Sequence, residues 1–98
     1  MTAYMVVSID VQDPSWVADY VANVPAIIAS HGGAYAAVSG PVTVLEGTAS
    51  APTQLAIFTF PSQEAITAFM KDPAYTPYKE ARLKGSTANI FSFDNKLG

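Results

Sequence analysis

The sequence predicts an α+β domain whose elements follow the order strand, helix, strand, strand, helix, strand. Three observations carry this prediction. Short runs rich in β-branched residues lie near both ends of the chain, apolar residues at helical spacing lie between them, and glycine and proline separate the segments. This order is that of the ferredoxin-like sandwich, in which two crossovers place the helices on one face of a four-stranded antiparallel sheet. A chain of 98 residues has room for one such domain, over residues 1–98.

The first strand is expected over residues 3–11, where two kinds of position alternate. The odd positions are all apolar, whereas the even positions are Tyr4, Val6, Ser8 and Asp10. Successive side chains of a strand point to opposite faces, so one face suits a dry core. The other face suits a lined cavity or a partly polar interface.

A helix is expected to begin after Asp13, a favourable N-cap, with Pro14 at its first position. Its apolar stripe comprises Val17, Tyr20, Val21, Val24, Ile27 and Ile28. Pro25 lies inside the stripe and is expected to kink or divide the helix, because proline removes a hydrogen bond. Residues 30–33 should end the helix, since a glycine there can take the left-handed conformation.

Strand-like segments follow over residues 34–40 and 42–47, and the Gly-Pro pair between them predicts a hairpin or a sharply bent strand. Residues 48–53 have the composition of a loop, and residues 54–60 form the third main strand.

Ser62 is expected to cap a second helix that runs to Met70. A further helical segment is expected over residues 76–84, and residues 87–93 form the last strand.

Composition excludes several classes of protein. Half of the residues are hydrophobic and only 13% are charged, against about 25% in typical domains. The net charge is −3 with five Lys and Arg residues, too few for a phosphate-binding face, so we expect no nucleic-acid partner. No apolar run is long enough to span a membrane, the first residues lack a basic leader, and we expect a cytoplasmic protein.

The third main strand is apolar on both faces. Leu55 and Ile57 alternate with Ala56, Phe58 and Phe60, whereas a sheet with one wet face should carry polar residues there. The helices can cover only one face. We therefore expect a second copy of the chain to pack against the other face, which gives a two-fold homodimer.

Four segments resemble those of a known family: "HGGAY" (31–35), "VLEG" (44–47), "FPSQEAITAF" (60–69) and "DPAYTPYKEAR" (72–82). In order and spacing they are similar to the family called domain of unknown function 1330, within the dimeric α+β barrel proteins. The resemblance implies a ferredoxin-like subunit and a homodimer whose sheets face each other. It implies no reaction, and the wider superfamily of cofactor-free monooxygenases, lactone isomerases and haem-degrading enzymes is linked by fold-level analogy alone.

The chain also departs from that family pattern. Family members usually carry an arginine where Ala34 stands, often another where Ser39 stands, and often a tryptophan–tyrosine pair where Phe69 and Met70 stand. These differences weaken any acidic substrate carried over from the family.

Three residues are candidates for polar chemistry. His31 has a side chain suited to a general base, or it is a helix C-terminal residue next to a Gly-Gly stop. Glu46 is a second catalytic candidate, or the ion-pair partner of Arg82. Arg82, the one arginine, suits a carboxylate of a ligand or of Glu46.

A small-molecule pocket is also predicted, with aromatic walls and a few polar groups. Its candidate residues, besides Arg82, are Tyr4, Ser8, Tyr35, Ser39, Tyr75 and Asn89, with Tyr78 and Trp16 as further aromatic neighbours. We expect no metal and no cofactor, because one histidine, scattered acids and no cysteine give no metal-ligand spacing.

Two functions remain open from the sequence. One is a small-molecule-binding protein or cofactor-independent enzyme, oxygenase-like or isomerase-like, in which His31 and Glu46 transfer protons and Arg82 binds an anion. The other is a non-catalytic homodimeric module with an accessory or stress-related role. A cavity larger than a few waters between strands and helices would discriminate them in favour of the first.

Overall fold

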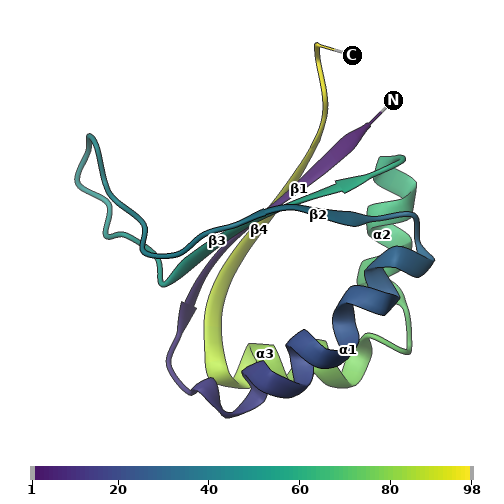
Figure 1. Cartoon of the computed structure of the whole chain (residues 1–98), viewed down its shortest axis with the longest axis horizontal. Coiled ribbons are helices and arrows are strands. Elements are labelled where there is room, and N and C mark those ends of the chain that lie inside the picture. Colours follow the sequence, from purple (N-terminus) through teal and green to yellow (C-terminus); the bar gives the residue numbers. More distant parts are fainter. Residues whose placement is uncertain (1, 98) are drawn as a thin grey trace.

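A computed structural model describes residues 2–97, which form four strands, three α-helices and one short 3-10 helix. The strands are β1 (Ala3–Val11), β2 (Ala34–Val38), β3 (Gln54–Phe60) and β4 (Ser86–Asp94). The helices are η1 (Pro14–Trp16), α1 (Val17–Ser30), α2 (Gln63–Lys71) and α3 (Thr76–Gly85). The strands form one antiparallel sheet in the order β2-β3-β1-β4, and the helices lie on one side of it (Figure 1). The predicted ferredoxin-like arrangement is confirmed.

The start of the first helical segment follows its sequence signals. The Asp13 carboxylate accepts a hydrogen bond from the backbone N–H of Ser15 at 2.9 Å, so Asp13 caps η1 as predicted. Helix α1 then continues through Pro25 to Ser30 without a break, so the predicted division of the helix there is wrong. Val24 and Ile28 are buried in the core, and their packing holds both halves of α1 in place despite the missing N–H.

The Gly-Gly pair ends α1 as the sequence predicts. His31 is the C-cap residue, and Gly32 has a φ of 77°, in the left-handed region that favours glycine. Gly33 has a different role: a Cβ there would lie 2.7 Å from atoms of Ile28 and Phe60. The second glycine therefore lets β2 approach the core closely.

The segment between β2 and β3 has no strand, so the strand predicted over residues 42–47 is wrong. Residues 39–53 form a long loop that projects beyond the sheet (Figure 1). Val44 and Leu45 are exposed on this loop, with 94% of Leu45 accessible. A β-branched composition favours a strand only where a neighbouring strand offers hydrogen bonds, and β3 begins after the loop has ended.

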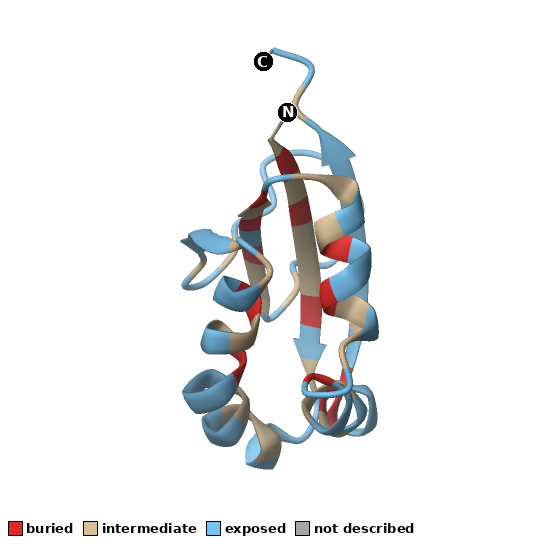
Figure 2. Cartoon of the chain, turned by 90° about the vertical axis from the view of Figure 1, so that its right-hand side faces the viewer, coloured by how far each residue is buried: buried red, intermediate tan, exposed pale blue. Residues whose placement is uncertain are grey.

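The core lies between the sheet and the helices. Its largest fully buried side chains are Phe60, Phe69, Tyr75, Ile28 and Val24. The rings of Phe69 and Tyr75 pack with centroids 4.3 Å apart, and those of Phe60 and Phe69 with centroids 5.9 Å apart. Figure 2 shows the buried segments as bands along the strands that face the helices.

The other face of the sheet is apolar and uncovered, as predicted. The register places Tyr4 opposite Phe93 and Val6 opposite both Phe91 and Ile57. Phe91 is 62% exposed and Phe93 is 50% exposed, and the Tyr4 and Phe93 rings stack at 5.5 Å. We call this surface the helix-free face.

Candidate functional site

A cavity of about 620 Å³ lies between the sheet and the helices. Typical small-molecule sites have volumes of roughly 300–1,000 Å³. The sheet contributes mainly apolar side chains, namely Met5, Val7, Ile9, Ala56, Phe58 and Ile90. The half-exposed Val21, Tyr35 and Val38 also line the cavity, so its mouth lies between α1 and β2.

Arg82 lines the cavity and is almost completely buried, with 4% of its surface exposed. Its Nε atom is buried without a hydrogen-bond partner in the described part of the chain. The Ser86 hydroxyl donates to the Arg82 carbonyl oxygen at 2.6 Å, which fixes the end of α3. A buried donor without a partner costs free energy, so the Nε atom of Arg82 is an unfavourable feature of the wall as it stands.

Two tyrosine hydroxyls meet beside this cation. The Oη atoms of Tyr20 and Tyr75 are 2.8 Å apart, and both residues line the cavity. Burial raises the pKa of Tyr20 well above its ordinary value, Tyr75 raises it further, and Arg82 opposes this increase. Burial also raises the pKa of Tyr35, with a smaller contribution from Tyr75. These hydroxyls therefore stay protonated and can donate hydrogen bonds.

Trp16 completes the polar part of the wall. Its Nε1 atom is buried and has no acceptor among residues 2–97. The Trp16 and Tyr20 rings pack edge to face with centroids 5.3 Å apart. A Cβ at Gly85 would lie 2.5 Å from Trp16 Nε1, so only glycine lets the indole pack this closely against the end of α3.

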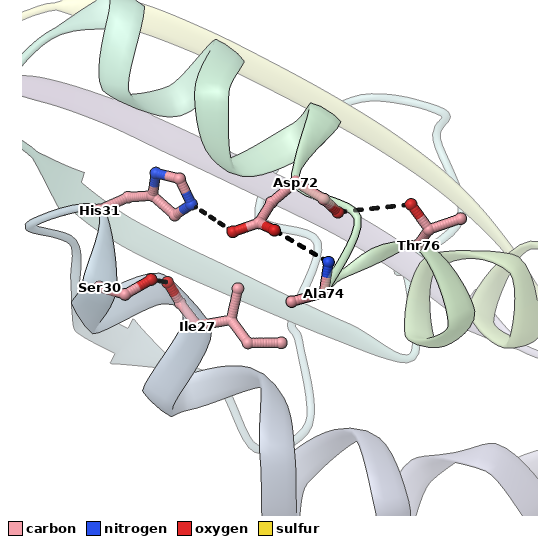
Figure 3. A network of polar contacts seen from close by, with 6 residues as sticks. All are labelled: Ile27, Ser30, His31, Asp72, Ala74 and Thr76. Carbon is pink, nitrogen blue, oxygen red and sulfur yellow. Dashed lines mark hydrogen bonds and ion pairs between the residues drawn. The ribbon is translucent and has the colours of Figure 1, made fainter.

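His31 makes an ion pair outside the cavity lining. Its Nε2 atom lies 2.7 Å from Oδ2 of Asp72, whose Oδ1 accepts from the backbone N–H of Ala74 at 2.8 Å (Figure 3). The hydrogen bond with His31, and then that with Ala74, hold the pKa of Asp72 below its ordinary value. This contact joins the end of α1 to the turn between α2 and α3. His31 also meets the ring edge of Phe69, which does line the cavity, at a centroid distance of 6.1 Å.

The acidic candidates do not reach the cavity. Glu46 lies exposed on the long loop, and within residues 2–97 it makes no ion pair with Arg82. Asp10 is exposed at the end of β1, where its carboxylate accepts from the backbone N–H of Thr53 at 3.1 Å. Across the described residues, no three His, Cys, Asp or Glu side chains gather as a metal site would require.

The predicted ligand-binding residues divide between the two faces of the sheet. Tyr35, Tyr75 and Arg82 line the cavity. By the strand alternation, Tyr4, Ser8 and Asn89 point to the helix-free face. The hydroxyl of Ser39 accepts from the backbone N–H of Leu55 at 2.8 Å, at the edge of the sheet.

Tyr20 lines the cavity but was not among the predicted site residues, whereas Trp16 was predicted as an aromatic neighbour of the pocket. Tyr20 belongs to the apolar stripe of α1, and Trp16 stands one helical turn before it. Their spacing of four residues puts them on one side of the helix, which is the signal that could have identified Tyr20. Nothing local indicates that Tyr20 meets Tyr75, because 55 residues separate them.

The family model described as a domain of unknown function, DUF1330, matches residues 2–95. The chain belongs to the DUF1330 family. The resemblance predicted from four short motifs is thus confirmed for this DUF1330 chain. No curated protein matches its sequence.

Solved structures share the fold of this DUF1330 chain at low sequence identity. A protein of unknown function from Rhodopseudomonas palustris has a TM-score of 0.82 and 14% identity, over 96% of this chain and 82% of that one. SnoaB, a cofactor-independent oxygenase from Streptomyces nogalater, has a TM-score of 0.68 and 18% identity, over 97% and 93%. A dimeric ferredoxin-like protein of unknown function from a Jannaschia species has a TM-score of 0.64 and 12% identity, over 97% and 100%. Within residues 2–97, no helix combines the length and apolar character needed to cross a bilayer.

Proposed function

We propose that this DUF1330 chain is a homodimer that binds a small, mostly apolar molecule in the cavity and acts on it without a cofactor, in oxygenase-like or isomerase-like chemistry. The observation that carries the proposal is the 620 Å³ cavity with a few buried polar groups in an apolar wall. A module whose sheet serves only for association of two copies has no need of such a space. Cavities of this size are costly in a domain this small, because their lining loses van der Waals contacts.

The helix-free face supports the homodimer. Phe91, Phe93 and Ile57 are exposed there, next to the partly buried Tyr4 and Val6. An exposed apolar surface of this kind is typical of an interface. The dimeric protein from the Jannaschia species has the same fold, which agrees with association of two copies.

The chemical class rests on the cavity and on a structural neighbour. SnoaB is a cofactor-independent oxygenase with this fold. An apolar cavity excludes water, and protonated hydroxyls beside a guanidinium can stabilise negative charge that develops on a substrate. Proton transfer by His31 or Glu46 stays a prediction, as do a cytoplasmic location and the absence of a nucleic-acid partner.

Ligand screening tests the proposal directly. We expect aromatic or keto-acid metabolites to raise the melting temperature, because a ligand at 100 times its Kd stabilises the folded state by about 2.7 kcal/mol. Trp16 is the one tryptophan and lines the cavity, so its fluorescence reports occupancy of this site.

The variant Ala56→Leu provides the matched test, because it grows a side chain into the cavity. Ala22→Leu, on the exposed side of α1, is the control. Hits that bind the Ala56→Leu variant as well as the wild type would contradict the cavity as the site, and a library without hits would contradict the function.

A further inference from the structure

The buried polar groups of the cavity have one property in common: each offers a hydrogen. The guanidinium Nε of Arg82 and the indole Nε1 of Trp16 are both buried without an acceptor in the described residues. Arginine and tryptophan side chains have no acceptor atoms of their own. Both nitrogens are closed off by protein atoms, so an acceptor in the cavity would meet Arg82 at the terminal nitrogens of its guanidinium.

The tyrosine pair adds another donor. One hydroxyl of Tyr20 and Tyr75 donates its hydrogen to the other across 2.8 Å, which leaves the second hydrogen for a further acceptor. Tyr75 is 1% exposed, so its hydroxyl is shielded from surface water, whereas Tyr20 is partly exposed. Both residues line the same cavity as Arg82, and the positive charge of Arg82 acts on Tyr20.

The charge of the cavity wall is positive and unopposed. Arg82 is the one charged residue among those that line it, within residues 2–97. The one ion pair among residues 2–97 joins His31 to Asp72, so no carboxylate of the described residues pairs with Arg82.

We infer that the cavity binds a small monocarboxylate with an apolar body, whose carboxylate is held by Arg82 with a hydrogen bond from the Tyr20–Tyr75 pair. This inference rests on the proposed function, because it names the ligand class of the same cavity. A single guanidinium matches a single carboxylate in charge and in its forked geometry. The surrounding apolar wall matches a hydrocarbon or aromatic body and disfavours polyanions and sugars.

The test compares acids with their neutral amides in the intact protein. The probes are naphthalene-2-carboxylate and 4-phenylbutanoate, each paired with its primary amide, and Trp16 fluorescence gives the Kd. We expect each acid to bind at least roughly tenfold more tightly than its amide, because hydrogen bonds to a charged acceptor are the stronger kind. Equal affinities for acid and amide would overturn the inference and leave the proposed function intact. If neither acids nor amides bind, the proposed function itself fails.

Substitutions test whether Arg82 is the residue responsible for the preference for acids over amides. In Arg82→Gln the preference for the acid should disappear, while the amides bind as before. Lys84→Gln removes an exposed charge of the same helix and should keep the preference. An Arg82→Gln protein that still prefers acids tenfold would overturn the inference.

A second variant keeps the inference testable if Arg82→Gln fails to fold. Tyr20→Phe removes one hydroxyl of the pair and should weaken acid binding roughly threefold to tenfold with little change for the amides. Tyr78→Phe removes a hydroxyl outside the cavity lining and serves as its control. Equal losses for acid and amide in Tyr20→Phe would contradict a role of the pair as carboxylate donor.

Discussion

Both faces of the sheet carry large apolar side chains, but they differ in whether helices cover those side chains and in the polar groups beside them. The helix-bearing face encloses a cavity in which Arg82, Tyr20 and Tyr75 place buried polar atoms. The helix-free face is open, and its most exposed rings are those of Phe91 and Phe93. Apolar surface with buried polar donors suits a small ligand, whereas open apolar surface suits a second copy of the chain.

The largest effect is expected from a charge on the helix-free face. Phe91→Asp should raise the dimer dissociation constant at least 100-fold, because a carboxylate buried at an apolar interface costs about 3 kcal/mol or more. Sedimentation velocity measures the change. The control is Leu83→Asp, since Leu83 is 59% exposed on α3, away from this face, against 62% for Phe91. A wild-type monomer, or a Phe91→Asp dimer, would refute the interface.

A smaller effect is expected when the charge of Arg82 is removed, and this change should stabilise the protein. Arg82→Met keeps most of the apolar stem and removes a buried guanidinium without a partner. The free energy of unfolding should rise by about 1–3 kcal/mol in urea titrations at fixed protein concentration. Acid binding should be lost in the same protein. A marked loss of stability would mean that the guanidinium already has a stabilising partner.

Filling the cavity should also stabilise the protein. Ala56→Leu places added methyl groups in empty apolar space, which should raise the free energy of unfolding by about 1–2 kcal/mol. Ala22→Leu should change the free energy of unfolding by only about a few tenths of a kcal/mol. If Ala56→Leu destabilises the fold as overpacking does, the cavity is too narrow for a ligand.

The smallest effect concerns a contact that belongs to neither face. The pKa of Asp72 lies below its ordinary value of 3.8, so the stabilisation from its bond to His31 is present above pH 3.8. It is lost as the pH falls through the lower folded value. Asp72→Asn should therefore be less stable than wild type at neutral pH, and the difference should vanish in acid. Asp94→Asn should show no such convergence, and a constant difference for Asp72→Asn would contradict the pair.

The fold could be predicted because its signals are local. Strand alternation over residues 3–11, the cap at Asp13 and the glycines after His31 each act within a few residues. The strand predicted at 42–47 was wrong because a strand depends on a partner, and the sheet offers none there.

The site was only partly predictable, because its contacts join distant segments. Arg82 was a candidate from its chemistry, but the sequence left open whether Glu46 neutralises it. The structure separates the two, since Arg82 is buried in the cavity wall and Glu46 is exposed on the loop. Tyr20 looked like one more apolar helix residue, and its hydrogen bond to Tyr75 arises only when α1 and the α2–α3 turn meet.

The separation of the two faces is tested most directly by the affinity of naphthalene-2-carboxylate for Phe91→Asp, at a concentration where sedimentation shows a monomer. The Phe91 side chain points away from the cavity, on the opposite face of the sheet from Ile90, so we predict a Kd within roughly twofold of the wild-type value. A monomer that no longer binds the acid would contradict the account, because the ligand site would then require the second copy of the chain.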